Sequence, residues 1–150
     1  MSRFYLSLLN NKRFLQENDF DYEFRSSCSL KLKDAGGKKM FYRRKYYIVK
    51  NEFVEEFNRH FKETNLPNQL SNGTRFIGRW MKKYDEMTTE IFAIWEYDSY
   101  EEYIEIETKI RQDQDHVARI KQWYEQHGGR DYVLSNYIVE VKDEELISTV

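Results

Sequence analysis

The strongest folding signal in the sequence is a strand–turn–strand–helix pattern that runs through residues 75–111. Residues 75–84 are rich in aromatic and branched side chains, and residues 89–97 alternate with the period of two that is typical of strands. The short, mostly polar connection between them fits a hairpin. Ser99 and Glu102 then form the Ser-x-x-Glu pattern of a capping box, whose side chains bind free N–H groups at a helix start. The stretch predicts an antiparallel strand pair that leads into a helix.

A similar strand–helix unit precedes this stretch. Residues 40–50 are expected to form a strand because of their aromatic and β-branched content, and Asn51 is the expected helix cap. Apolar side chains then recur at helical spacing, at Phe53, Val54, Phe57 and Phe61. Residues 65–74 contain a proline and an Asn-Gly pair, so we expect a loop there.

The remaining segments continue the alternation of helix and strand. Polar residues 112–115 interrupt the helix that starts after Ser99, a second helical segment follows, and Gly128-Gly129 is a helix stop. Residues 132–141 alternate again and predict the last strand. Residues 143–150 form a short, charged tail.

The order of these elements predicts the fold class. Strand–helix–strand–strand–helix–strand is the ferredoxin-like βαββαβ arrangement, an α+β fold with a four-stranded antiparallel sheet and the helices on one face. The strand at residues 89–97 carries large apolar side chains on both faces, such as Trp95 on one and Phe92 on the other. The pattern leaves open which face meets the helices. Because aromatic residues remain on the other face, we expect two sheets to pack face to face in a homodimeric α+β barrel.

The domain is expected to span residues 40–142, with residues 143–150 as a C-terminal tail. Residues 1–39 lack a sustained helical period and have loop-like segments. One interpretation is an N-terminal arm that packs on the domain or on a second subunit. The other is an upstream extension from an over-long gene assignment, with Met40 as the natural start, if purine-rich codons for Gly36-Gly37-Lys38-Lys39 resemble a ribosome-binding site.

Composition narrows the function classes. The net charge of −2 gives no reason to expect nucleic acid or an acidic membrane surface as a partner. No uninterrupted apolar run is long enough to span a bilayer. Cys28 is the only cysteine, which excludes an internal disulfide and favours a reducing, cytoplasmic setting. Aromatic residues make up 17% of the chain, and so much aromatic surface needs a core, a partner or a ligand to cover it.

With these elements in place, residues 40–141 resemble the NIPSNAP family of the dimeric α+β barrel superfamily. The shared features are short motifs in matching order, namely Arg44-x-Tyr46, Phe76-Ile77-Gly78, Trp95-x-Tyr97 with Ser99, and Trp123. The family usually has a Pro-Gly pair after the first strand, where this sequence has Lys50-Asn51. That difference affects the turn more than the fold.

The resemblance implies a homodimeric barrel but no particular activity. Relatives within the superfamily include cofactor-free monooxygenases, haem-degrading enzymes, chlorite-dismutase-like proteins and stress-response barrels. To infer chemistry from them is an analogy at the level of the fold. The haem-degrading relatives use an Asn–Trp–His set, and the first strand of this sequence has no Asn. We therefore expect no cofactor.

Four residues are the candidates for a ligand site. Trp80 and Trp95 are placed to line a pocket between sheet and helices, or inside the barrel, and to stack on a flat ligand; alternatively, both are core aromatics. Arg44 with Tyr46 can hold an acidic or enolic oxygen at the mouth of such a pocket. Arg44 can equally pair with Glu90 or Glu96 across neighbouring strands.

The histidines give no metal pattern. His116 is a candidate base or axial ligand, but it follows the polar helix break, so a solvated histidine at a helix start is the expected reading. His60 and His127 are not spaced from other ligand residues in a recognised metal motif. We expect no metal site.

The sequence thus predicts a NIPSNAP-like homodimer of unassigned activity. It is expected to bind a small apolar or aromatic ligand in a cavity, with Arg44, Tyr46, Trp80 and Trp95 as the lining. One alternative is a cofactor-independent oxidation in which the protein supplies a desolvated pocket and a proton acceptor. The other is a non-catalytic dimerisation or scaffold module.

Overall fold

We describe the fold from a computed structural model, in which residues 39–150 are described. The interpretations of the first 38 residues lie outside this part of the chain. The elements in chain order are β1 (Phe41–Lys50), the 3₁₀ turn η1 (Asn51–Phe53), α3 (Val54–His60), the π-helical turn η2 (Phe61–Asn65), α4 (Leu66–Ser71), β2 (Arg75–Lys83), β3 (Thr88–Tyr97), α5 (Tyr100–Gln112), α6 (Gln114–Gln126), α7 (Arg130–Asn136) and β4 (Ile138–Leu146).

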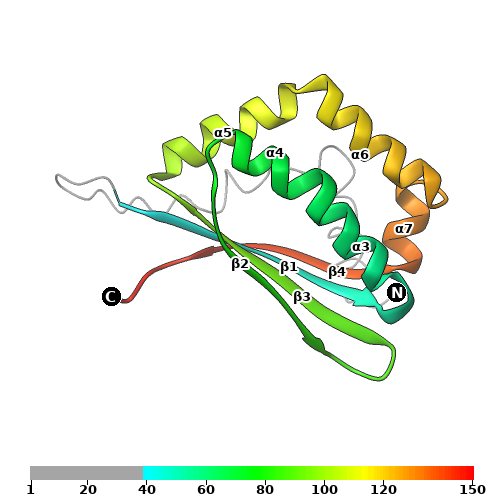
Figure 1. The fold of residues 1–150 in the computed structure, drawn as a ribbon. Helices are drawn as coiled ribbons and strands as arrows, with labels where there is room; N and C mark the ends of the chain where they lie inside the picture. The colour runs from blue at the N-terminus through cyan, green and yellow to red at the C-terminus, as the bar shows by residue number, and fades with distance from the viewer. Residues whose placement is uncertain (1–38) are drawn as a thin grey trace, which may run out of the picture. The chain divides into compact units, whose positions relative to one another are not determined.

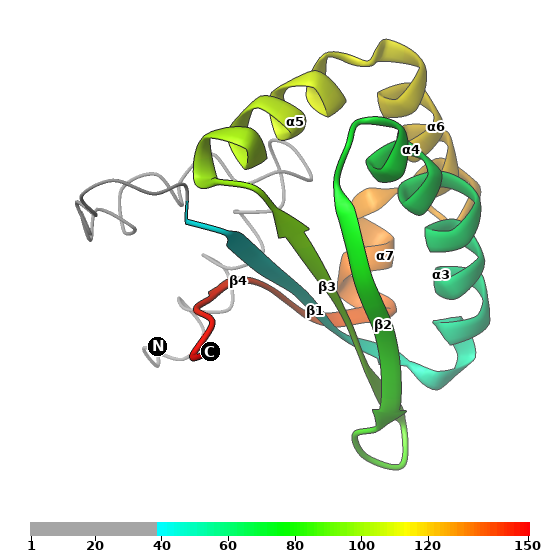
Figure 2. The same cartoon turned by 60° about the vertical axis from the view of Figure 1, so that its left-hand side comes forward.

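The strands form one four-stranded sheet in the order β2-β3-β1-β4, and each neighbouring pair is antiparallel. The helices lie together on one side of this sheet (Figure 1). This is the ferredoxin-like α+β fold that the element order predicts. Turning the molecule shows β2 at one edge and the β2–β3 connection at one end of the sheet (Figure 2). Among the described residues, no helix combines the length and apolarity needed to cross a bilayer.

Ring contacts settle which face of the sheet meets the helices. The Tyr47 ring lies 4.9 Å from Phe57 of α3, and the Arg43 guanidinium lies 4.4 Å above the Tyr103 ring of α5. Because side chains alternate along a strand, the odd-numbered residues of β1 and of β3 belong to this inner face. The outer face then carries the even-numbered residues of both strands, including Arg44, Tyr46 and Phe92.

The edge strand β2 contains a bulge. Phe76 lies opposite Trp95 and Gly78 lies opposite Ile94, so Ile77 is an extra residue. Trp80 is on the outer face, where its ring covers Gly78; a Cβ atom at Gly78 would collide with the indole. The bulge and the glycine therefore let a large aromatic side chain lie flat on the outer face.

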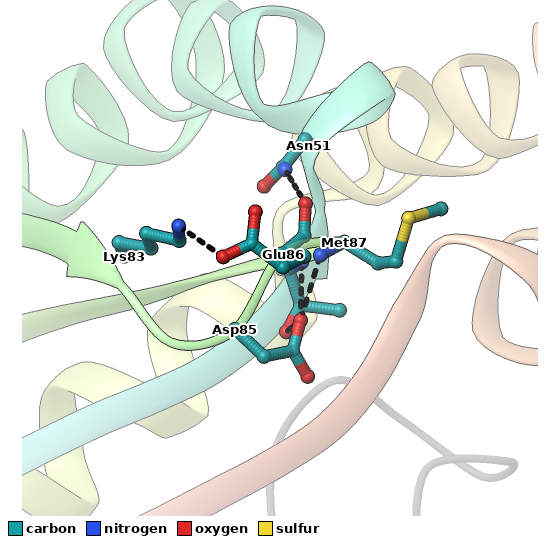
Figure 3. A network of polar contacts seen from close by, with 6 residues as sticks. Asn51, Lys83, Asp85, Glu86 and Met87 are labelled. Atoms are coloured by element: carbon teal, nitrogen blue, oxygen red, sulfur yellow. Dashed lines mark hydrogen bonds and ion pairs between the residues drawn. The ribbon is translucent and has the colours of Figure 1, made fainter.

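The first helical region is longer than the sequence predicts. The expected loop at residues 65–74 is wrong, because η2 and α4 continue the helix to Ser71. Pro67 stands in the first turn of α4, directly after the π-helical turn η2, so the regular helical hydrogen bonding is interrupted where a residue without an N–H group enters the helix. The cap assigned to Asn51 is also wrong: its Nδ2 donates to the Glu86 carbonyl at 3.0 Å, outside the helix (Figure 3).

The hairpin between β2 and β3 forms as predicted, without an Asn-Gly turn. The Oδ1 atom of Asp85 accepts hydrogen bonds from Met87 N, Thr88 N and Thr88 Oγ1, each at 2.8 Å, and Lys83 pairs with Glu86 at 2.6 Å (Figure 3). The Thr88 hydroxyl and the backbone donors lower the pKa of Asp85. This side chain replaces the usual turn signal by binding the turn's own backbone.

The helix starts and stops in the second half follow the sequence more closely. Ser99 Oγ accepts from Glu102 N at 3.1 Å, so the predicted cap is confirmed. Asp113 separates α5 from α6, and its Oδ1 accepts from His116 N at 3.0 Å. Gly128 and Gly129 have φ values of 99° and 97°, which end α6 as predicted.

The last predicted strand is only partly right. Residues Arg130–Asn136 form helix α7, in which Val133 and Leu134 are buried, and β4 begins at Ile138. The strand continues to Leu146, beyond the expected domain boundary at residue 142. Asp143 and Glu144 therefore pair with β1, opposite Lys45 and Arg44.

Candidate functional site

A row of four residues crosses the inner face of the sheet. Lys45 of β1 lies opposite Asp143 of β4 on one side and Ala93 of β3 on the other, and Ala93 lies opposite Arg79 of β2. The row thus has charged side chains at both ends and a buried alanine, 2% exposed, between Lys45 and Arg79. It lies under the helices, in the layer where a ligand was expected.

At the β4 end, one carboxylate holds two cations. Asp143 Oδ1 accepts from Arg43 Nε at 2.7 Å, and Asp143 Oδ2 lies 2.5 Å from Lys45 Nζ. Burial alone would raise the pKa of Asp143, but the charges of Lys45 and Arg43 outweigh it and hold the pKa below its usual value. Asp143 is therefore ionised at neutral pH and fixes both cations in place.

A second carboxyl group, Glu107 of α5, is buried close to these cations. It is 2% exposed, and its Oε1 is 3.4 Å from Gln69 Nε2. Its Oε2 is buried without a hydrogen-bond partner within residues 39–150. Burial raises the pKa of Glu107, although Lys45 and Arg43 oppose the shift. A carboxyl group in such surroundings is suited to accept or release a proton.

A chain of polar side chains links Glu107 to the sheet. Thr74 Oγ1 donates to Gln69 Oε1 at 2.7 Å, and Gln69 in turn reaches Glu107. Tyr97 of β3 is hydrogen-bonded with Thr74, and burial raises the pKa of Tyr97. These contacts orient the Oε1 side of Glu107 and leave the Oε2 side for another group.

The sequence analysis missed Glu107, although a signal was present. Residues 103, 106 and 110 form the buried stripe of α5, and position 107 falls on the same stripe. A glutamate on the apolar face of an amphipathic helix is unusual, because charged side chains are seldom fully buried without a pair. A glutamate at this position of the helix therefore indicates a buried polar site.

The four predicted ligand residues do not come together. Trp95 is on the inner face, 5% exposed, with its ring 4.9 Å from Phe76 and 6.0 Å from Phe61. Arg44, Tyr46 and Trp80 are on the outer face, where the Arg44 guanidinium lies 5.2 Å from the Tyr46 ring. A single pocket within one subunit therefore cannot use all four.

The predicted pairing of Arg44 with Glu90 or Glu96 is wrong. Arg44 Nη2 donates to both carboxylate oxygens of Glu144, at 3.1 and 3.0 Å. Glu96 pairs instead with Arg75 at 2.7 Å. The last strand is predicted only as far as residue 141, so Glu144 is not expected to lie beside Arg44.

The histidines lie in the helix layer. His116 is 3% exposed, so its expected solvated position is wrong. His60 stacks on Trp123 with ring centroids 3.9 Å apart, and Glu56 Oε1 accepts from Trp123 Nε1 at 2.9 Å. His127 Nε2 is 3.3 Å from the same Glu56 oxygen. Within residues 39–150, no three His, Cys, Asp or Glu side chains are grouped to hold a metal ion.

Comparison with known proteins agrees with this fold. The family model described as NIPSNAP matches residues 42–127. A NIPSNAP family protein from Agrobacterium tumefaciens superposes with a TM-score of 0.57 at 19% identity, over 77% of this chain and 91% of that one. A NIPSNAP-like domain protein from Burkholderia xenovorans gives 0.55 at 15% identity, over 75% and 87%.

A further nipsnap family protein from Agrobacterium tumefaciens, described as having unknown function, gives a TM-score of 0.55 at 15% identity. The superposition covers 74% of this chain and 89% of that one. At such identities the solved structures support the fold and no more. The search among curated proteins gives no match.

Proposed function

This chain belongs to the NIPSNAP family, and on that premise we propose that it is a homodimeric protein that binds a small, largely aromatic ligand between its helices and the inner face of its sheet. The observation that carries the ligand proposal is the unsatisfied Oε2 atom of Glu107. A buried polar atom without a partner costs about 1–3 kcal/mol. A ligand that donates a hydrogen bond to this atom would offset the cost.

The surroundings of Glu107 suit a flat ligand with one polar group. Aromatic rings gather beside α5: Phe41 and Tyr97 lie 5.0 and 5.1 Å from the Tyr103 ring. The Arg43 guanidinium covers the same ring at 4.4 Å. Aromatic faces bind flat apolar bodies, and a few convergent polar groups fix their orientation.

Native mass spectrometry of Glu107→Gln tests the ligand proposal. The amide keeps the size of the side chain but replaces one carboxylate oxygen by an NH₂ donor and removes the charge that strengthens a hydrogen bond to the other. Exposed Glu105 on the same helix provides the matched control, Glu105→Gln. We expect a reproducible extra mass on wild type and on the control under gentle conditions, and at least a tenfold smaller liganded fraction for Glu107→Gln. A ligand-free wild type, or equal loading of all three proteins, would contradict the proposal and favour a scaffold module.

The homodimer is proposed from the outer face. Trp80 is 48% exposed there, its ring lies 5.6 Å from Phe92, and Phe92 and Ile94 are partly exposed. Tyr46 and Ile48 of the same face are buried. A second copy that packs its sheet on this one would cover the exposed aromatic side chains in an isologous interface.

Light scattering of Trp80→Glu tests the dimer. A charge in place of this large, half-exposed aromatic side chain should weaken association by about 30-fold or more, the effect of losing a typical hot spot. Val117, 44% exposed on α6, provides the control Val117→Glu, which should remain dimeric. If wild type is a monomer at all concentrations, the dimer is wrong, and residues 1–38 of the same chain become the segment to test as the cover.

A second candidate function rests on the raised pKa of Glu107. The Glu107 carboxylate would take a proton from an acidic O–H or C–H group of the ligand, and Arg43 and Lys45 would stabilise the anion formed. A carbanion formed in this way from a CH₂ group would add to dioxygen, the peroxide would take the proton back from Glu107, and the hydroperoxide would lose water to leave a carbonyl group, with dioxygen as the oxidant. Oxygen uptake that requires the ligand and is absent in Glu107→Gln would support this enzymatic function. Ligand binding without oxygen uptake would contradict it, and only the binding function would remain.

A further inference from the structure

Arg79 stands at the opposite end of the inner-face row from Asp143. Its Nη1 donates to Asn58 Oδ1 of α3, and its Nη2 is buried without a hydrogen-bond partner among the described residues. Within the same part of the chain, no carboxylate faces the guanidinium. Burial lowers the pKa of Arg79 to about 10, and among residues 39–150 the Tyr47 phenol is the only titratable group that counters the shift.

The other strand arginines show how unusual this is. Arg43 pairs with Asp143, Arg44 with Glu144, and Arg75 with Glu96. Arg79 has an amide as its polar partner instead. Arg44 and Arg75 also have a buried donor atom without a partner among the described residues, but each has a carboxylate beside it. A half-buried guanidinium with an amide in place of a carboxylate is the arrangement expected of a group whose counter-ion arrives with a ligand.

The side chains around Arg79 are flat and apolar. The guanidinium carbon lies 4.4 Å from the Phe61 ring and 5.4 Å from the Phe57 ring. Phe61 in turn lies 6.0 Å from Trp95, and the small Ala93 is the next residue along the row. Phe61 also opens the π-helical turn η2, a distortion that is often found at functional sites.

The charges of the layer fix the sign and number of the expected ligand charges. At the β4 end, the two cations Arg43 and Lys45 face the two carboxyl groups of Asp143 and Glu107, and these charges cancel when Glu107 is ionised. Among the charged side chains of the row, together with Arg43 and Glu107, Arg79 is then the one cation whose charge is not balanced. A monoanion beside it would leave the layer neutral.

We propose that Arg79 binds the carboxylate of a small aromatic acid, with the aromatic body lying over Ala93 against Phe61 and Trp95. This assignment rests on the proposed function, in which a ligand binds between the helices and the inner face of the sheet, and it names the chemical class of that ligand. A planar guanidinium also suits phosphate, but the adjoining aromatic rings favour an organic acid over a free inorganic anion.

The test compares benzoate with its neutral analogue benzamide by equilibrium dialysis against the full chain. A charge-assisted hydrogen bond corresponds to about a 10- to 100-fold preference, so wild type should bind benzoate that much more tightly. Arg79→Met should bind both probes equally. Exposed Arg119 provides the matched control, Arg119→Met, which should keep the preference. Arg79→Lys retains the charge without the planar fork, and it should keep part of the preference.

The melting temperature measured without ligand distinguishes a ligand-binding role of Arg79 from a structural one. The two roles predict changes of opposite sign in Arg79→Met. Removing an unpaired, half-buried charge should leave the melting temperature of Arg79→Met equal to or above that of wild type. A lower value, together with an unchanged benzoate preference in this variant, would mean that Arg79 only packs against Phe57 and Phe61.

Other outcomes separate this assignment from the proposed function. If wild type binds benzoate and benzamide equally, the carboxylate assignment fails while the ligand layer stands. If inorganic phosphate displaces benzoate at lower concentration than benzoate itself binds, the site takes a phosphate and the assignment also fails. If neither probe binds and the purified protein carries no extra mass, both proposals fail together.

Discussion

The two faces of the sheet use charged residues in different ways. On the inner face, Arg43, Lys45 and Asp143 form a compact cluster in which the Arg43 side chain is only 2% exposed and the other two are mostly buried. On the outer face, Arg44 and Glu144 form a pair whose side chains stay 32% and 36% exposed. Neighbouring residues of the same two strands thus take part in one buried and one solvated pair.

This difference shows which face is suited to chemistry. Electrostatic interactions are stronger where the dielectric is low, and unpaired polar atoms cost more there. Both faces have buried atoms without a hydrogen-bond partner among the described residues, Arg44 Nε and Arg75 Nη2 on the outer face and Glu107 Oε2 and Arg79 Nη2 on the inner side. Arg44 and Arg75 each have a carboxylate beside them, whereas Glu107 and Arg79 have only an amide as their hydrogen-bond partner. The outer face has partly exposed aromatic side chains, which suit association with another sheet. The inner face is therefore the ligand side and the outer face the assembly side of our proposals.

Replacing one tryptophan on each face gives the largest expected losses of stability. Trp95→Ala should lower the free energy of unfolding by about 3–5 kcal/mol, because Trp95 is packed in the core. Trp80→Ala should cost only about 1–2 kcal/mol, since half of its side chain is already exposed within the subunit. Urea unfolding measures both. Equal losses would erase the distinction, whereas a Trp80→Ala loss that depends on protein concentration would sharpen it.

Removing one carboxylate on each face gives the next largest losses of stability. Asp143→Asn removes the carboxylate that contacts both Arg43 and Lys45 in the interior, so a loss of about 3–5 kcal/mol is expected. Glu144→Gln removes a half-exposed partner of Arg44 and should cost at most about 1 kcal/mol. The same unfolding measurement reports both values. The ranking is wrong if the outer substitution costs as much as the inner one.

The smallest expected effect lies in the helix layer that covers the inner face. Burial lowers the pKa of His60 from 6.5 to about 4, while Glu56 opposes the shift and His116 and His127 add to it. The unfolded chain binds this proton more readily than the folded one, so stability should fall as the pH drops from 6.5 towards 4. The decrease should reach at most about 3 kcal/mol.

His60→Phe isolates this contribution, because a phenyl ring can keep the stack on Trp123 without titrating. The unfolding free energies of both proteins are measured between pH 7 and pH 4. Over this range the wild-type value should fall by up to about 3 kcal/mol more than the value of the variant. Parallel profiles would show that His60 titrates in the folded protein as it does in the unfolded chain.

Short-range signals in the sequence were read correctly where local physics decides the structure. The Ser99 cap, the Gly128-Gly129 stop and the alternation of residues 89–97 each depend on neighbouring residues only, and each is confirmed. Residues 132–141 misled the analysis because a few alternating residues fit both a strand and a short helix. In the structure this segment is helical up to Asn136, and the helix buries Val133 and Leu134.

The sequence by itself determined the fold class and the family, because periodicity, caps and short motifs are local and retain their order. Only the tertiary structure decided the candidate site. Arg44 and Glu144 are 100 positions apart, as are Arg43 and Asp143. Which of these pairs is buried depends on strand register and on the face that the helices cover. The partnerless atoms of Glu107 and Arg79 likewise became visible only when packing placed every neighbouring group.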